Sequence, residues 1–516
     1  MNYADLFRAT LPETVLELAA LLVLLVDLGL LRNAALKSRV ASATLIGVAG
    51  CAVAIWAVYA AGWGSLSNGS YVVLAAGGST AVAQVAILFL TALTLALFID
   101  TGFTRNPGEY VAVVLMAAAG GLIIAAAQDL LVIFVGLELL SLGLYILTAF
   151  AKKSAKSAEA SIKYYLFGGM SAAFLLFGFS YLYGLSGSTS LPRVVLGTYM
   201  ASAHGGTFLL LIALVMIAVG LGFKVAAVPF HLWAPDTYEG APAPAAAFIA
   251  SVSKVASFAL LISISHAILW WPSMLHLTGG RVTFTVSPPG TPPPHMTYGF
   301  VSGWPLILMV LSAASMIIGN LAALAQTSVR RLLAYSAVAH AGYILLGLAF
   351  FGWANVSAQA ILYYIITYGL TTIGAFGVVG VVERATGSDK LDSFLGLQKR
   401  NPLLAAVLLV LFLSLAGIPP LVGFWAKFNL FAAVLRAPGA GVWALGMVAM
   451  ALGASAVSLY YYLQVLKRAY VMPAADETPI HAHPVTLAVL LLIALAVLLM
   501  GVFPAVLQGW IAGFGA

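Results

Sequence analysis

Cysteine and charged residues are both scarce in this chain of 516 residues. Cys51 is the only cysteine, which excludes a disulfide framework, a zinc site with cysteine ligands and an iron–sulfur cluster held by this chain alone. Charged residues make up 8% of the sequence, against roughly 25% in soluble domains, while hydrophobic residues make up 63%. These shortages exclude a soluble globular protein, and they predict that any redox chemistry takes place on a partner.

The excess of basic residues does not indicate nucleic acid. The formal net charge is +7, but a nucleic-acid surface needs lysines and arginines gathered on one solvated face, and here they lie in short loops. His481 and His483 also stand in a loop, in a stretch too short to form a metal site by itself. We therefore expect no nucleic-acid partner and no metal site in this chain.

Fourteen apolar stretches have the length that a membrane-spanning helix needs, which is about 20 residues for a hydrocarbon core of about 30 Å. They start near residues 11, 40, 78, 108, 129, 160, 206, 243, 301, 329, 355, 401, 441 and 485. A spanning β-barrel would instead show alternating segments of about ten residues. We therefore predict an all-α membrane protein with about 14 transmembrane helices.

The basic residues predict how these helices cross the membrane, because short loops rich in lysine and arginine stay in the cytoplasm. Loops on one side hold sixteen of the 23, and loops on the other side hold four, Arg8, Arg193, Arg281 and Arg436. With fourteen spans, this bias puts both termini outside the cytoplasm. It also makes the proline-rich stretch 269–300 an external loop.

The three remaining basic residues, Lys224, Lys254 and Lys427, and one acid, Glu138, lie inside apolar spans. A charge at the centre of a membrane helix costs roughly 2.5 to 3.5 kcal/mol on insertion scales, so such residues are functional candidates by default. A buried lysine or glutamate can change protonation near neutral pH, which suits proton transfer. Snorkelling to the membrane surface is the alternative, and it fits best for Lys224, which lies nearest a span end.

Several other polar residues have simpler explanations. Asp236 and Glu239 follow the seventh span, where they would cap helix ends or meet neighbouring chains. Asp129 stands at a span boundary, where solvent suffices to explain it. The tyrosines of the eleventh and thirteenth spans could orient water, but tyrosine near the membrane surface is the more common case; they are Tyr363, Tyr364, Tyr460, Tyr461 and Tyr462.

Proline interrupts two of the predicted spans. The seventh contains Pro229 five residues after Lys224, and the twelfth contains Pro419 and Pro420 ahead of Lys427. Helices broken at membrane depth persist only where protein or a water-filled cavity satisfies the freed carbonyls, and transporters often pair such helices in inverted repeats. Spans 4–8 and 9–13 fit this pattern, because the broken helix is fourth in each set of five and an odd number of crossings inverts the second set.

These repeats predict how the chain is organised. The expected segments are three transmembrane helices in 1–100, a first five-helix repeat in 108–268, the external loop 269–300, a second, inverted repeat in 301–471, and a last transmembrane helix in 485–512.

Four stretches of the sequence resemble the antiporter-like proton-translocating subunits of respiratory complex I. They are KVAAVPFHLWAPDTYEGAPAPAAAFIASVSK from Lys224, AEASIKYYLFGGMSAAFLLFGFSYLYG from Ala158, RRLLAYSAVAHAGYILLGL from Arg330 and LAGIPPLVGFWAKF from Leu415. The resemblance covers essentially the full chain. The PDTYEGAP form resembles the N branch of the bacterial NADH:quinone oxidoreductase rather than its L or M branches; the M branch has a glutamate at the position of Lys427, and the L branch adds a long lateral helix.

The resemblance implies a row of proton-transfer residues through the membrane. It assigns this role to Glu138, Lys224, Lys254, His340 and Lys427, with an ion pair between Glu138 and Lys224 that tunes the lysine and with His340 as the bridge between two half-channels. A histidine that is simply hydrogen-bonded within the bundle is the alternative for His340. Lys163 is either a cytoplasmic anchor or part of the proton uptake path, and the sequence leaves both open.

The implied function is proton translocation in NADH:quinone oxidoreductase, driven by quinone reduction elsewhere in the complex. NADH, FMN, Fe–S clusters and quinone would then be bound by partner subunits, with chains K and M flanking this chain in the bacterial inner membrane, lipid around it and both termini in the periplasm. The alternative is a subunit of a multi-subunit cation/proton antiporter or of a membrane-bound hydrogenase. A stand-alone solute transporter fits poorly, because the broken helices show lysine and apolar neighbours rather than a polar substrate site.

Overall fold

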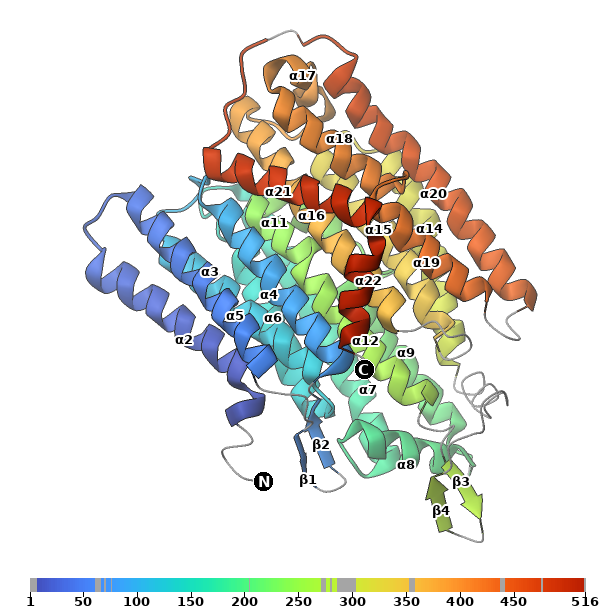
Figure 1. Ribbon diagram of the computed structural model, residues 1–516. Coiled ribbons are helices and arrows are strands. Elements are labelled where there is room, and N and C mark those ends of the chain that lie inside the picture. Colours follow the sequence, from blue (N-terminus) through green and yellow to red (C-terminus); the bar gives the residue numbers. More distant parts are fainter. Residues whose placement is uncertain are drawn as a thin grey trace.

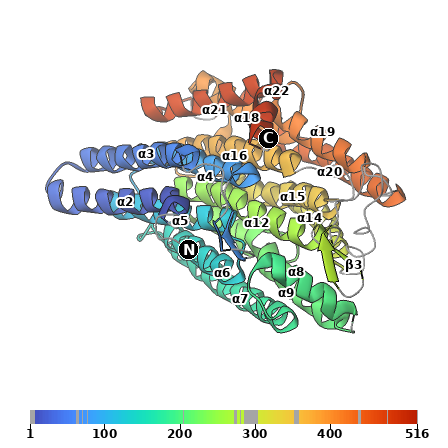
Figure 2. The same ribbon diagram turned by 60° about the horizontal axis from the view of Figure 1, so that its bottom comes forward.

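The computed structural model describes residues 7–60, 66–68, 71–75, 77–203, 205–270, 275–278, 281–284, 303–351, 358–436, 441–474 and 477–514. Helices dominate these residues and pack side by side as one bundle (Figures 1 and 2). The first part contains α2 (Leu11–Leu25), the π-helix η1 (Val26–Leu30), α3 (Leu36–Ala60), the hairpin β1 (Leu66–Asn68) and β2 (Tyr71–Leu74), and α4 (Gly78–Phe98).

The predicted first repeat contains eight helices, some of them short. They are α5 (Pro107–Ala126), α6 (Leu130–Thr148), α7 (Ala155–Ser186), α8 (Leu191–Ala203), α9 (Thr207–Val225), α10 (Trp233–Gly240), α11 (Ala243–Ala250) and α12 (Val252–Trp270). Most of the predicted external loop 269–300 lies outside the described residues. Its described part includes the antiparallel strands β3 (Leu275–Thr278) and β4 (Arg281–Phe284).

The predicted second repeat and the C-terminal helices follow. They are α14 (Trp304–Leu324), α15 (Val329–Ala349), α16 (Ala358–Thr386), the 3₁₀-helix η3 (Leu391–Phe394), α17 (Leu397–Arg400), α18 (Pro402–Ala416), α19 (Val422–Leu435), α20 (Gly441–Tyr470), α21 (Pro484–Val502) and α22 (Pro504–Gly513).

Twelve helices among the described residues are long and apolar enough to cross a membrane. They coincide with twelve of the fourteen predicted spans. The first predicted span is α2, with 15 residues, continued by η1, and the twelfth is divided into α18 and α19, with 15 and 14 residues. The all-helical membrane fold is confirmed, and the count of fourteen stays a prediction.

Charged side chains gather at one end of the bundle, which we call the basic face. Its ion pairs include Arg331 with Asp236, Arg330 with Glu383, Arg384 with Asp100 and Lys399 with Glu477. The two hairpins and α8 lie at the other end, the opposite face (Figure 1). This separation agrees with the loop charges expected from the sequence.

The helix pairs α5/α6 and α14/α15 pack in the same way, through glycines that let two backbones approach closely. A Cβ atom added to Gly120 would lie 2.6 Å from the backbone nitrogen of Leu140, and one added to Gly319 would lie 2.7 Å from that of Ala339. Both residues of the second contact are numbered 199 higher, from 120 to 319 and from 140 to 339. This offset relates α6 to α15 residue by residue.

Helices α7 and α16 also end alike. Gly187 and Gly387 both have left-handed backbone, with φ of 68° and 73°, and each N–H donates a 2.7 Å hydrogen bond to a carbonyl four residues earlier. The turns after these helices then pair with the turns before α6 and α15 through backbone hydrogen bonds of 2.9 Å. The donor–acceptor pairs are Leu130–Thr189 and Leu191–Gln128 in the first repeat, and Val329–Asp389 and Leu391–Thr327 in the second.

The matching helices run in opposite directions. Lys156 and Lys163, in the first turns of α7, form ion pairs with Glu239 and Asp236 of α10, and Arg331 at the start of α15 pairs with both acids. The end of α6, which comes just before α7, therefore lies at the same face as the start of α15. This antiparallel arrangement is what an inverted repeat requires.

Candidate functional site

Lys254 joins the two predicted repeats in the interior of the bundle. Its side chain is 3% exposed, and Nζ donates a 2.7 Å hydrogen bond to the carbonyl of Ala337 in α15. Nζ also lies 5.8 Å from the ring centroid of Tyr368 in α16. A break at Ser251, which separates α11 from α12, precedes this lysine. The sequence did not predict this break because no proline marks it.

His340 lies one turn after Ala337 on α15 and is surrounded by tyrosines. Its ring centroid is 4.8 Å from that of Tyr368 and 5.7 Å from that of Tyr343. Nδ1 shares a 2.9 Å hydrogen bond with the hydroxyl of Tyr364, and Nε2 lies 3.5 Å from the hydroxyl of Tyr462. Both ring nitrogens therefore face groups that can donate or accept a proton.

The side chain of Lys427, in α19, reaches the break between α18 and α19 in the twelfth predicted span. Its Nζ donates to the carbonyls of Leu415 and Ala416, at 3.2 and 2.9 Å, where α18 ends, and to the hydroxyl of Ser455 at 2.8 Å. These carbonyls belong to the last turn of α18, where the helix offers no partner of its own. Nζ also lies 5.3 Å from the ring centroid of Tyr343. The structure thus connects Lys254, His340 and Lys427 through the rings of Tyr368 and Tyr343.

Lys224 is buried apart from these three. It occupies the last turn of α9, is 4% exposed, and donates a hydrogen bond from Nζ to the hydroxyl of Ser141 in α6. Glu138 lies one turn before Ser141 and is half-buried. Within the residues that the structure describes, no ion pair links Glu138 to Lys224, so the predicted pair is open here. Snorkelling is excluded for all three lysines, since Lys427 is also only 6% exposed.

Residues of the site stand at matching positions in the two predicted repeats. With the offset of 199 residues, Ser141 corresponds to His340 and Glu138 corresponds to Ala337. Lys224 therefore bonds the residue that matches His340, and Lys254 bonds the backbone of the residue that matches Glu138. At the position in α15 that matches Glu138, Lys254 thus meets a main-chain carbonyl, which accepts a hydrogen bond but cannot take up a proton.

Lys163 belongs to an ionic cluster at the basic face rather than to the interior. It is 40% exposed and pairs with Glu159 and Asp236, and Asp236 is also bound by Arg331. Burial works to raise the pKa of Asp236, but hydrogen bonds from Lys163 and Arg331 together hold that pKa below its ordinary value. Asp236 and Glu239 bind cations of this chain and make no side-chain hydrogen bond that caps α10, so the predicted capping was wrong. Contact with neighbouring chains stays a prediction.

Two other predictions from the sequence were wrong. Asp129 is 4% exposed, and its carboxylate accepts hydrogen bonds from Leu131 N–H and from the hydroxyl of Thr189, so solvent does not explain it. Most of the tyrosines assigned to the membrane surface are buried. Those at most 2% exposed are Tyr363, Tyr364, Tyr461 and Tyr462, whereas Tyr460 is 59% exposed.

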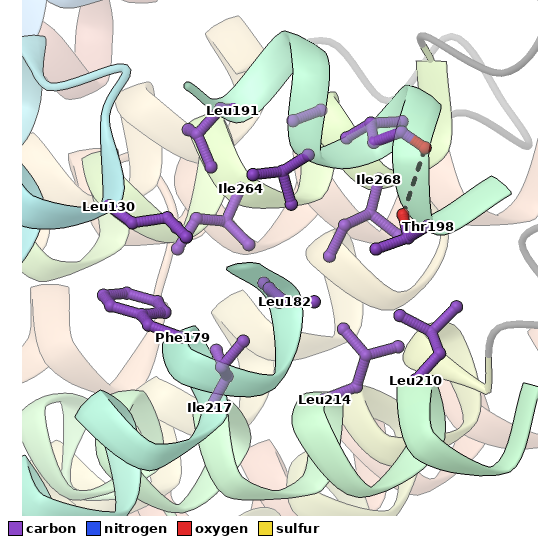
Figure 3. A pocket seen from close by; sticks show the side chains of 13 residues that line it. Leu130, Phe179, Leu182, Leu191, Thr198, Leu210, Leu214, Ile217, Ile264 and Ile268 are labelled. Carbon is purple, nitrogen blue, oxygen red and sulfur yellow. Dashed lines mark hydrogen bonds between the residues drawn. The ribbon is translucent and has the colours of Figure 1, made fainter. Parts of the chain in front are cut away.

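An apolar cavity beneath α8 has no part in this site. Figure 3 shows it lined by leucine, isoleucine and phenylalanine side chains from α6, α7, α8, α9 and α12. Its volume is about 30 Å³, and the hydroxyl of its one polar residue, Thr198, donates to the carbonyl of Val195 at 3.0 Å. A cavity of this size and lining offers water too few polar partners to carry a proton.

Comparison with known proteins agrees with the geometry. The profile of the family described as NADH:quinone oxidoreductase/Mrp antiporter, TM matches residues 127–284 and 294–453. The NADH-quinone oxidoreductase subunit N 2 of Acidobacterium capsulatum is 45% identical over 99% of both chains. A chain in the structure of respiratory complex I from Thermus thermophilus is 31% identical, with a TM-score of 0.73, over 96% of this chain and 98% of that one.

A chain of the Mrp complex from Dietzia has the same fold, with a TM-score of 0.75, over 97% of this chain and 96% of that one, but only 21% identity. The fold is thus shared across the family, and sequence identity separates its branches. This chain belongs to the NADH:quinone oxidoreductase/Mrp antiporter membrane family, in the branch of NADH-quinone oxidoreductase subunit N.

Proposed function

We propose that this chain is a proton-translocating membrane subunit of NADH:quinone oxidoreductase, and that Lys224, Lys254, His340 and Lys427 transfer the protons. The observation that carries the proposal is the buried series from Lys254 through His340 to Lys427. Three titratable side chains in an apolar bundle are costly for stability, and here they lie within reach of shared aromatic rings and hydroxyl groups.

The chemistry of this series is proton exchange. The lysines bond carbonyl and hydroxyl oxygens rather than carboxylates, so no fixed anion holds the ammonium form in place. A lysine in such surroundings can release its proton when the local field changes. His340 then offers one nitrogen toward Tyr364 and the other toward Tyr462, which lets a proton arrive at one nitrogen and leave from the other.

Glu138 acts in this proposal as a movable partner of Lys224. In the described structure Lys224 bonds Ser141, and Glu138 stands one turn away on the same helix. Closing the Glu138–Lys224 pair would stabilise the ammonium form, and opening it would release the proton toward Lys254. Lys163 takes part in the ionic cluster at the basic face, where it pairs with Glu159 and Asp236. In this proposal it influences the start of the proton uptake path through these two acids.

The cluster and the turns described above support the division into two inverted repeats, 108–268 and 301–471. The same proposal places NADH, FMN, Fe–S clusters and quinone on partner subunits, with K- and M-type chains on either side in a bacterial inner membrane and the termini in the periplasm. A cation/proton antiporter subunit is less well supported, because the likeness to the Mrp chain rests on fold and the likeness to subunit N rests on sequence as well.

Substitution of Lys427 tests the proposal. In inverted membrane vesicles with assembled complex, Lys427→Ala should lose at least about tenfold in NADH-driven proton pumping, since a positioned proton-transfer group contributes roughly 10²- to 10⁴-fold. Lys399→Ala, at the exposed Lys399–Glu477 pair, is the matched control. Intact pumping by Lys427→Ala would refute the role of this lysine. Purification of the chain with antiporter subunits alone would refute its assignment to NADH:quinone oxidoreductase.

A further inference from the structure

Helix α2 carries two acids on neighbouring turns, Glu13 and Glu17, although it belongs to the first predicted span. Glu13 is 4% exposed, and its Oε1 accepts a 3.2 Å hydrogen bond from the side-chain amide of Gln84 in α4. Its Oε2 is buried and has no hydrogen-bond partner among the described residues. Glu17 is exposed. Like charges one turn apart are unfavourable, and neither acid forms an ion pair within the part of the chain that the structure describes.

Glu17 lies inside the apolar layer rather than at its surface. Ala19 of α2 is level with Gly50 of the antiparallel helix α3, since a Cβ atom added to Gly50 would lie 2.5 Å from Cβ of Ala19. Trp56 and Tyr59, 67% and 50% exposed, stand at the end of α3 near the opposite face, and such side chains are typical of the membrane surface. With a rise of about 1.5 Å per residue, Glu17 lies about 6 Å deeper than Trp56 and about 10 Å deeper than Tyr59. A carboxylate at this depth is costly when it faces lipid.

The same face of α2 continues as a row of leucines. Leu18, Leu21 and Leu25 are 60%, 62% and 65% exposed, and Leu28 in η1 is 51% exposed. Their spacing of three and four residues is the a and d pattern of helices that pack knobs-into-holes, and Glu17 then occupies a g position, where salt bridges bind a partner helix. We call these four leucines and Glu17 the α2 seam. Lipid alone would explain the leucines, but the carboxylate needs a cation on a second helix.

The inner side of α2 is held tightly, so the α2 seam has a fixed shape. Where α2 passes into η1, Asp27 pairs with Arg39 of α3 at 2.7 Å and accepts a 3.2 Å hydrogen bond from the N–H of Gly108 in α5. Figure 1 shows α2 as the outermost helix on its side of the bundle. The helix therefore presents a preformed surface outward.

A second copy of this chain does not fit the α2 seam. Two copies insert in the same orientation, so their α2 helices would run parallel, and a g residue in a parallel pair faces an e residue of its partner. Glu17 would then face Leu22, which carries no charge and is 49% exposed. The charge pattern thus requires a different chain.

We propose that the α2 seam is a docking surface for a transmembrane helix of a neighbouring chain, and that this helix presents a lysine or arginine to Glu17. The cation balances the two acids in the apolar layer, where water is scarce. The inference goes beyond the proposed function, because it concerns assembly on the N-terminal helices, outside both predicted repeats, and requires no proton transfer.

Photo-crosslinking in native membranes that hold the intact complex tests the docking. Leu21→benzoylphenylalanine and Leu25→benzoylphenylalanine should each form a covalent adduct with one other chain. Mass spectrometry should place the two attachment sites about one turn apart on a transmembrane helix that carries a lysine or arginine. Leu492→benzoylphenylalanine, at a position 56% exposed on α21, is the control and should give no adduct with that chain.

Three outcomes would overturn the docking. They are adducts with lipid alone, adducts with a second copy of this chain alone, and an equal yield of the same adduct from the control position. Pumping is not the measured quantity, so each of them would leave the proposed function standing.

Substitution of Glu17 tests the charge. Glu17→Leu should lower the adduct yield from position 21, measured per assembled complex, by about three- to tenfold, the range of a polar contact between membrane helices. Glu17→Asp keeps the charge and should keep most of the yield. Neither change removes a side-chain bond within the described part of the chain, so both variants should assemble. Full yield in Glu17→Leu would overturn the pairing with a cation.

Discussion

Lys254 and Ala337 join the two halves of the molecule, because the ammonium group of one donates to the main-chain carbonyl of the other across the predicted repeat boundary. The carbonyl cannot be titrated, and it belongs to the turn that carries His340. Lys254 is thereby held beside the histidine without a carboxylate that would fix its charge.

This contact predicts the same result for two substitutions of Lys254, one that removes the charge and one that keeps it. Lys254→Met and Lys254→Arg should both abolish most NADH-driven pumping, because arginine keeps the charge but cannot release its proton in proteins. Pumping is measured in inverted vesicles, with Lys399→Arg at the basic face as the control. Restored pumping in Lys254→Arg would show that this position needs a fixed charge and no proton exchange.

Tyr364→Phe should slow proton transfer without unfolding the bundle. The substitution removes the hydroxyl that bonds Nδ1 of His340 and keeps the buried ring. We expect a loss of up to about 10²-fold in the pumping rate, the lower end for a positioned proton-transfer group. Tyr460→Phe, at an exposed position, is the control, and equal rates for the two variants would refute the role of Tyr364.

Arg331→Gln should lower the stability of the chain. Arg331 is 29% exposed and bonds Asp236 and Glu239; hydrogen bonds to charged groups contribute about 1.5 to 3 kcal/mol, and partial exposure puts this case at about the lower value. Thermal unfolding in detergent measures the change. Lys399→Gln, from a pair 72% and 63% exposed, should shift the midpoint far less; equal shifts would contradict the prediction.

The stability difference between wild type and Arg331→Gln should depend on pH through the lowered carboxyl pKa values of Asp236 and Glu239. For both Asp236 and Glu239, burial opposes the shift, and bonds from Lys163, Lys156 and Arg331 outweigh it. A carboxyl group whose pKa is lower in the folded state stabilises the fold when it is ionised. This stabilisation is complete above the ordinary pKa values of 3.8 and 4.5, and it is lost as pH falls through the lowered pKa values of the folded chain. The difference between wild type and Arg331→Gln should therefore stay constant down to about pH 5, and a decline already near neutral pH would argue against it.

Gly417→Ala should disturb Lys427. Gly417 has a left-handed φ of 88°, and an added Cβ atom would lie 3.0 Å from Cδ and 3.2 Å from Nζ of the lysine. We expect lower stability and lower pumping together. Gly446→Ala, inside α20 with open space around the added atom, should instead be neutral or stabilise by about 0.5 to 1 kcal/mol. An equal loss of stability and pumping in both variants would contradict the predicted strain at Gly417.

Sequence patterns predicted most of the fold because length and hydropathy decide it. Proline marked the breaks after α9 and α18, whereas Ser251 gave no such signal and its break was missed. Composition also identified Lys224, Lys254 and Lys427, since a lone charge in an apolar span is conspicuous. The surroundings of His340 could not be predicted, because they bring α15, α16 and α20 together, and contact between distant helices has no local pattern.

Asp236 shows why the sequence predicted helix capping where the structure has ion pairs. A carboxylate beside a helix end suggests capping when its partners are unknown, and those partners, Lys163 and Arg331, lie far away in the sequence. Tyr363, Tyr364 and Tyr462 were misassigned for the same reason. Their helices are apolar all round, so the sequence did not show which face meets lipid.

The matching turns beside α6 and α15 each bond a carboxylate to a hydroxyl, in opposite order along the chain. In the first repeat the carboxylate is on Asp129, before α6, and the hydroxyl is on Thr189, after α7; in the second, the hydroxyl is on Ser328 and the carboxylate on Asp389. Acid and alcohol have exchanged sides while the bond between them is kept. Because the hydrogen bond needs one carboxylate and one hydroxyl but not a fixed order, exchanging Asp129 with Thr189 should preserve the link, whereas either change alone should remove it.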